Sequence, residues 1–220
     1  MYSPILVIHI IAGFLALGSS FVAVYTKLVT DRHQLHLYSG RLFCWAMTIV
    51  FVTSIALTLL KPNLFLFVIA IFSYYLTFHG WRLALNRKGE AKFWDKTAAW
   101  VMIATSIVMI GTGGWFQLQG NGFGPVLVLF GLIGGLTAGQ NLREFAAGPV
   151  KGKDRISGHL GAMLGATIAA ITAFVVTNIQ SDPAWIAWIA PTIIITPLIV
   201  YSKRKIEGKT GRKSKKQTKD

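Results

Sequence analysis

Long apolar stretches dominate the chain, and short polar segments separate them. Each stretch is about 20 residues long, the length that an α-helix needs to cross the roughly 30 Å hydrocarbon layer of a bilayer. The separators, such as "KPN" at 61 and "QLQGNGFGP" at 117, are rich in residues that break helices. The pattern predicts seven membrane-spanning helices, at residues 4–26, 42–60, 63–81, 97–117, 123–142, 156–178 and 184–202.

Composition supports this interpretation. Of the 220 residues, 53% are hydrophobic and only 14% are charged, against about 25% charged in soluble domains. We therefore predict an all-α polytopic membrane protein with a seven-helix transmembrane domain over residues 1–203. Because only "KPN" separates the second stretch from the third, six spans and a re-entrant segment remain an alternative.

The distribution of basic residues predicts the orientation. If seven spans alternate in direction, every one of the 22 lysines and arginines except Lys61 lies on the same side. Positively charged loops stay in the cytoplasm, so the N-terminus is expected outside and the C-terminus inside. We expect the protein to be a multi-pass component of the bacterial cytoplasmic membrane.

The last residues, 204–220, are basic and almost free of apolar side chains, which predicts a disordered cytoplasmic tail. Its expected partner is the bilayer, through anionic lipid headgroups, and no nucleic-acid role is expected. Glycines at three- and four-residue spacing, as in "GLIGGLTAG", allow helices to approach closely. They leave both a monomer and a homodimer open.

Histidines supply the candidate chemistry. His33, His36, His79 and His159 all fall near the cytoplasmic side of the predicted topology, although they are far apart in sequence, and only His9 falls near the outside. Imidazole binds zinc, copper and haem iron, and helix bundles build such sites from side chains on facing helices. His36, His79 and His159, with Met163 one turn beyond His159, are the candidate cofactor ligands. The same three histidines and His33 are the candidate metal ligands.

Two cofactors fit these residues: one haem of the b type held by two histidines, or a transition metal such as zinc held by three. The opposing interpretation is that an amphipathic histidine is simply comfortable near lipid headgroups. Neither interpretation identifies a catalytic residue, so the sequence does not decide whether the protein is an enzyme.

Other polar side chains in or near the spans are candidates because polar groups in a membrane usually face the interior of the bundle. Asp95 shares the cytoplasmic side with Asp31 and Asp154. Such acids either orient imidazoles or neutralise neighbouring basic residues, and we favour neutralisation. The candidate polar residues are His9, Arg41, Tyr75, Arg82, Asp95, Asn141 and Asn178.

Several of these residues stand in recognisable segments. "HIIAGFLALGSS", "HLYSGRLFCWAM", "FHGWRLAL" and "GHLGAMLGATIAAITAFVVTN" resemble an uncharacterised family of bacterial polytopic membrane proteins with a domain of unknown function. The resemblance covers about residues 5–202 and implies no reaction. The matching positions are His9, His36, Gly40, Arg41, Gly80, Trp81, Arg82, His159 and Met163.

Better-understood membrane proteins limit the chemistry. Cytochrome b561-type proteins hold haems between paired histidines near both membrane faces, and this chain resembles them only on the cytoplasmic side. The sequence therefore favours metal- or haem-dependent chemistry at the cytoplasmic histidines. A transporter or small-ligand carrier and a non-catalytic accessory protein remain alternatives.

Overall fold

Seven α-helices make up the structure, a computed structural model that describes residues 2–30 and 32–217. Side chains are described up to Arg204, with Leu28 excepted. All seven helices are long and apolar enough to cross a membrane, which confirms the predicted number. They are α1 (Tyr2–Leu28), α2 (His33–Leu60), α3 (Leu64–Leu85), α4 (Phe93–Leu118), α5 (Gly124–Ala147), α6 (Gly152–Asn178) and α7 (Trp185–Gln217).

The third apolar stretch forms one continuous helix, α3, rather than a re-entrant segment. At the end of the bundle where α2, α4 and α6 begin, the helices extend past the apolar stretches into charged sequence. We call this end the basic end, and the other the opposite end. The extension places His33 at the start of α2, although the sequence suggested a loop, because "HQLHLYSGR" has no proline to interrupt the backbone hydrogen bonds.

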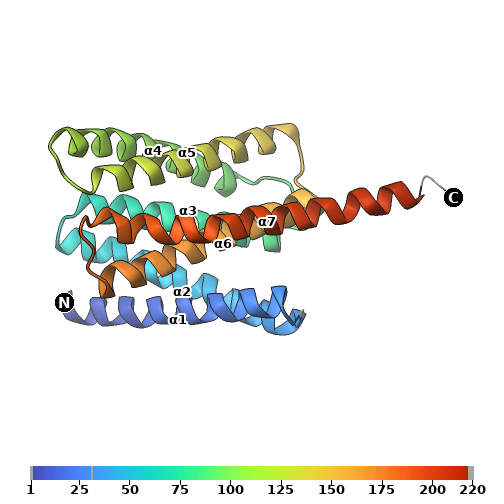
Figure 1. Cartoon of the computed structure of the whole chain (residues 1–220), viewed down its shortest axis with the longest axis horizontal. Helices are drawn as coiled ribbons and strands as arrows, with labels where there is room; N and C mark the ends of the chain where they lie inside the picture. The colour runs from blue at the N-terminus through green and yellow to red at the C-terminus, as the bar shows by residue number, and fades with distance from the viewer. Residues whose placement is uncertain (1, 31, 218–220) are drawn as a thin grey trace.

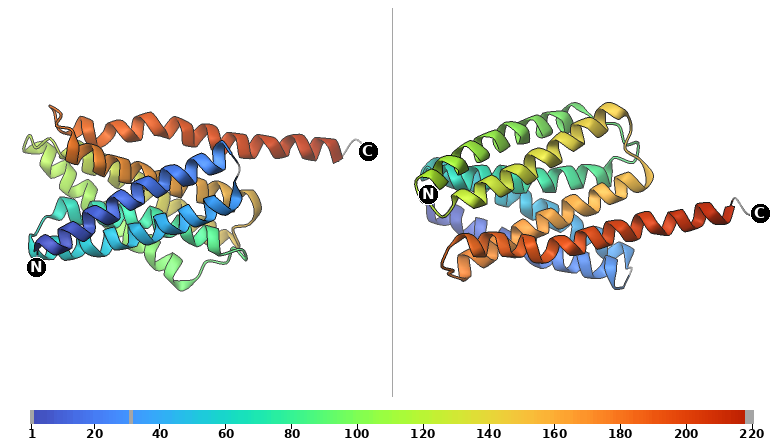
Figure 2. Two further views of the ribbon diagram at one scale, coloured as in Figure 1. Left: turned by 90° about the horizontal axis from the view of Figure 1, so that it is seen from below. Right: turned by 45° about the horizontal axis from the view of Figure 1, so that its top comes forward.

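Two helix pairs flank a central pair. Figures 1 and 2 show α1 along α2 on one side and α4 along α5 on the other, with α3 and α6 between them and α7 against α6. Four helices form a ring of neighbours, in which α1 packs on α2, α2 on α3, α3 on α6 and α6 on α1. Across this ring, no described Cα atom of α2 lies within 8 Å of one in α6. The two diagonal helices therefore approach each other only through side chains.

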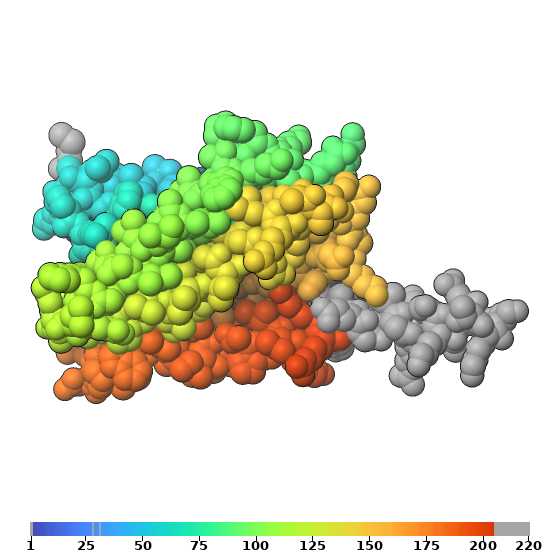
Figure 3. Space-filling view, turned by 90° about the horizontal axis from the view of Figure 1, so that it is seen from above, coloured from blue at the N-terminus to red at the C-terminus, as the bar shows by residue number. Residues whose placement is uncertain are grey.

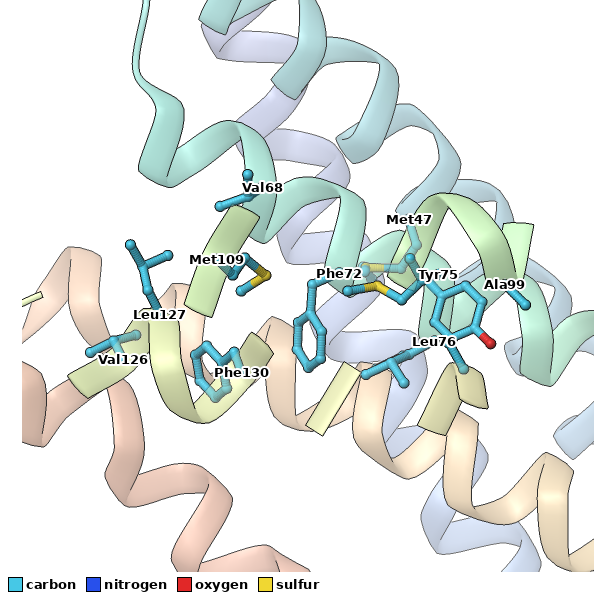
Figure 4. Close-up of a cluster of buried hydrophobic side chains, with 14 of the residues drawn as sticks. Met47, Val68, Phe72, Tyr75, Leu76, Ala99, Met109, Val126, Leu127 and Phe130 are labelled. Carbon is cyan, nitrogen blue, oxygen red and sulfur yellow. The ribbon is translucent and has the colours of Figure 1, made fainter. Parts of the chain in front are cut away.

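Most of the large side chains that are fully buried lie on α3, α4 and α5. Figure 4 shows Phe72 of α3 facing Phe130 of α5, with ring centroids 5.3 Å apart, and Met109 of α4 beside them. Met102 and Leu127 are fully buried in the same core. Outside this core, large apolar side chains are exposed along the helices, as expected for a surface that faces lipid: Leu136 and Ile194 are each 74% exposed. Figure 3 shows α4 and α5 side by side across one face.

Helix α7 contains Pro191 and Pro197 and continues to Gln217. It thereby runs through most of the segment predicted to be a disordered tail. The tail sequence contains no proline and many lysines and arginines, which tolerate helical backbone well. Its distal part projects beyond the rest of the bundle at the basic end (Figure 1).

Candidate functional site

Two histidines from the diagonal helices of the ring meet near the basic end. The ring of His36 on α2 and the ring of His159 on α6 have centroids 6.4 Å apart and planes at 90°. Both side chains are half-buried. Because the α2 and α6 backbones do not pack together, this ring contact is a meeting of side chains across the middle of the four-helix ring.

Each of these rings is held by a backbone carbonyl of a third or fourth helix. Nδ1 of His36 lies 3.0 Å from the carbonyl oxygen of Ala23 on α1, and Nδ1 of His159 lies 2.9 Å from that of Gly80 on α3. A carbonyl oxygen only accepts, so Nδ1 carries the proton in both rings. All four helices of the ring thus contribute to the pair.

The protonation of Nδ1 leaves Nε2 of each neutral imidazole with a free lone pair. Neither Nε2 atom has a hydrogen-bond partner in the part of the chain that the structure describes. Metal-binding histidines commonly show this arrangement, in which one nitrogen donates to a carbonyl and the other points at the ion. His36 and His159 therefore have the features of two metal ligands, each oriented by a hydrogen bond from Nδ1 to a backbone carbonyl.

The separation of the rings can be compared with simple coordination geometry. With metal–nitrogen bonds of about 2 Å and each nitrogen about 1 Å from its ring centre, two imidazoles on opposite sides of one ion have centroids about 6 Å apart. The observed 6.4 Å agrees with this value. An edge-to-face contact between two rings also occurs at such distances. The unpartnered Nε2 atoms favour ligation over simple ring packing.

A glycine beside the pair has open space in front of it. Gly40 lies one turn after His36, and a Cβ atom built there would meet no atom within 4 Å. Close packing of two helices therefore does not require a glycine at this position.

His79, the third histidine predicted for the site, lies elsewhere. Its ring is stacked against Tyr75, with centroids 6.1 Å apart, and also contacts Phe145 on α5. It is only 8% exposed and lines a cavity of about 20 Å³, large enough for one water molecule, beside Arg82 and Asp95. In the described residues no three His, Cys, Asp or Glu side chains form a group that could hold a metal ion.

Met163 packs against the backbone of α3. A Cβ atom on Gly80 would lie 3.1 Å from Met163 Cγ and 3.1 Å from Ala162 Cβ, so this glycine allows α3 and α6 to approach. The same close approach brings the Gly80 carbonyl to His159. Met163 therefore lies against the same glycine of α3 whose carbonyl holds the His159 ring.

Asp95 and Asn141, two of the polar candidates at the basic end, have protein partners. Asp95 forms a bidentate ion pair with Arg82, at 2.6 Å to Nε and 2.9 Å to Nη2, and accepts the Lys92 backbone N–H at 2.8 Å. The preference for charge neutralisation fits Asp95, but its partner lies on another helix rather than beside it in sequence. Asn141 donates to the Tyr75 hydroxyl at 2.7 Å, with both side chains buried.

The remaining candidates lie outside the pair. His33 and Arg41 are exposed on α2. Toward the opposite end, His9 Nδ1 lies 2.9 Å from Thr53 Oγ1, and exposed Asn178 donates to the Phe174 carbonyl at the end of α6. Asp31 lies outside the described residues.

No sequence pattern indicated the two carbonyls that orient the pair. Every residue has a carbonyl, so nothing marks Ala23 as an acceptor, whereas Gly80 belongs to the "FHGWRLAL" segment and was singled out only for its resemblance. In comparisons with known proteins, no family model matches the sequence, and neither a curated protein nor a solved structure matches it.

Proposed function

We propose that this protein is an integral membrane haem protein that binds one haem between His36 and His159. The supporting observation is the pair itself: two imidazoles from diagonal helices, each with Nδ1 on a carbonyl and Nε2 without a partner. The proposed topology has the N-terminus outside and the basic end in the cytoplasm, because almost all lysines and arginines lie at that end. The site is then near the cytoplasmic face of the bacterial inner membrane.

Ligand count favours haem over a bare ion. A structural zinc ion takes four protein ligands and a catalytic one takes three, whereas haem supplies four nitrogens itself and needs at most two from the protein. The described residues offer two histidines at this place and no third ligand of the usual kind. Two imidazoles at a tetrahedral ion would also have centroids only about 5 Å apart.

When bound, the haem would supply one-electron redox chemistry, and His36 and His159 would hold it. The chain's own contribution is to fix the direction of each lone pair through the Ala23 and Gly80 carbonyls. Membership of the uncharacterised family that the motifs resemble remains part of this proposal and adds no reaction to it.

The test is spectroscopy of the full chain purified in detergent from cells supplied with a haem precursor. We expect one haem per chain, with the sharp visible bands of a six-coordinate low-spin haem after reduction. His36→Ala and His159→Ala should lose this spectrum, because each removes one axial ligand. His9→Ala is the matched control and should keep it, since His9 bonds to Thr53 toward the opposite end.

A second variant keeps the test informative if an alanine variant does not fold. His159→Met retains a possible axial ligand, so it should bind haem with a shifted spectrum and a higher reduction potential. Pure protein without haem would refute the proposal, and so would an unchanged spectrum in both His36→Ala and His159→Ala. Stoichiometric zinc by elemental analysis, lost in the same variants, would favour the bare-ion alternative.

A further inference from the structure

A groove runs along the outside of the α1–α2 hairpin at the basic end. It has a volume of about 450 Å³ and is formed by the last turns of α1, the linker and the first turn of α2. Phe21 is 54% and Tyr25 57% exposed, so the groove opens to the surroundings of the bundle. Its main lining residues are Phe21, Val22, Tyr25, Thr30, Arg32 and Leu35.

The groove changes from apolar to polar along the helix axis. Phe21 and Val22 form the part farthest from the basic end, and Tyr25 follows one turn after Phe21, about 6 Å nearer the basic end. Thr30 and Arg32 lie in the linker, beyond the last turn of α1. In the proposed topology this order is that of a phospholipid in the inner leaflet, with acyl chains deep and the phosphate at the edge.

Two hydrogen-bond donors at the polar end are available. In the described residues, neither the Arg32 guanidinium nor the Tyr25 hydroxyl has a hydrogen bond or ion pair. The threonine hydroxyls are already used: Thr26 donates to the Val22 carbonyl at 2.7 Å and Thr30 to the Thr26 carbonyl at 3.3 Å. A guanidinium binds phosphate oxygens in a bidentate manner, so Arg32 suits a phosphodiester.

We propose that this groove binds one anionic phospholipid of the bilayer, with its phosphate at Arg32 and Tyr25 and an acyl chain along Phe21, Val22 and Leu35. Charge decides the lipid class. The Arg32 guanidinium, which has no ion pair among the described residues, disfavours the cationic headgroup of a zwitterionic lipid. The site is separate from the haem proposal and from the diffuse attraction of the basic tail.

The experiment uses the full chain in detergent, titrated with dioleoylphosphatidylglycerol or dioleoylphosphatidylcholine, with bound lipids counted by native mass spectrometry. We expect one phosphatidylglycerol to bind more tightly than the rest and more tightly than phosphatidylcholine. Arg32→Gln should weaken this first lipid about fivefold, the usual effect of one basic residue near a membrane surface. Arg87→Gln is the matched control, since it removes the same charge from an exposed position at the basic end that does not line the groove.

A second variant separates the groove from charge alone. Val22→Trp fills the apolar part without changing charge and should also weaken the first lipid. Equal weakening in Arg32→Gln and Arg87→Gln would overturn the proposal, as would equal affinity for the two lipids. Unchanged binding in Val22→Trp would also overturn the proposal, because it would show that only surface charge is involved. If the protein forms a dimer that does not bind the first lipid, a second copy of the chain occupies the groove and the proposal is wrong.

Discussion

Two parts of the bundle use glycine in opposite ways. Between α4 and α5, glycines stand where helices touch: a Cβ atom on Gly113 would lie 2.9 Å from the Gly124 carbonyl oxygen, and one on Gly134 would lie 2.5 Å from Met102 Cε. In the α1–α2 hairpin, by contrast, Gly13, Gly18 and Gly40 face open space. Glycine thus lets α4 and α5 approach each other closely, whereas it has no such role between α1 and α2.

The polar side chains show a second contrast, between the α3–α4–α5 part and the ring of α1, α2, α3 and α6. In the α3–α4–α5 part, the Arg82–Asp95 and Tyr75–Asn141 contacts satisfy buried polar groups within the chain. In the ring, His36 and His159 have one nitrogen satisfied and one without a partner. Unsatisfied ligand atoms suit the binding of a further group, whereas polar groups that are satisfied within the chain suit a scaffold. This difference distinguishes the proposed site from the part of the bundle that supports it.

The largest effect is expected in the α3–α4–α5 part, from Asp95→Asn. This change leaves the Arg82 guanidinium, 25% exposed, without its charged partner. Removing one member of a buried ion pair is strongly destabilising, and we expect a loss of about 3 kcal/mol in the free energy of unfolding. Thermal unfolding in detergent measures it.

Asp154→Asn is the control for that change, because Asp154 is an exposed acid in the first turn of α6. It should alter the free energy of unfolding by no more than about 0.5 kcal/mol. Equal stability of the two variants would show that the Arg82–Asp95 pair does not join α3 to α4 in the way we describe.

A smaller loss is expected from Gly113→Ala. The added methyl group would press on the Gly124 carbonyl and on Leu127 Cβ, each 2.9 Å away, and neither belongs to a flexible side-chain end. Overpacking of this kind costs about 2 kcal/mol. The neighbouring Gly114→Ala meets nothing within 4 Å and should be neutral or stabilising by up to about 1 kcal/mol. Two variants of equal stability would refute the close contact of α4 with α5.

The helices could be predicted from the sequence because the signal is local. Each apolar stretch is long enough by itself to indicate a spanning helix, and the "KPN" and glycine-rich separators indicate where one helix ends. The helix ends were less predictable. Hydropathy marks only the apolar portion, so the polar first turn of α2, with His33, was interpreted as part of a loop.

The site was predicted only in part, because it depends on which helices are neighbours. Sequence position placed His36, His79 and His159 at one end, but adjacent residues on a helix point about 100° apart. On α3, the Gly80 carbonyl therefore accepts a hydrogen bond from His159 on α6, while the preceding His79 packs against Phe145 on α5. Neither the rotation of α3 nor the diagonal placement of α2 and α6 can be read from one sequence.

The smallest expected effect, from Gly40→Ala, tests the space beside His36 directly. The added methyl group meets no protein atom within 4 Å, so the protein without haem should keep its stability or gain up to about 1 kcal/mol. Because Gly40 lies one turn from His36 on the same helix face, a haem bound to His36 would meet this methyl group. We expect about tenfold weaker haem binding, equivalent to an overpacking cost of about 1.4 kcal/mol, measured by haem titration.

Gly139→Ala on α5, another glycine that faces open space, is the control and should give the same gain in stability without weakening haem binding. If both variants bind haem as the unaltered protein does, the space beside Gly40 does not belong to the haem site, and the His36–His159 pair must bind its ligand from another side.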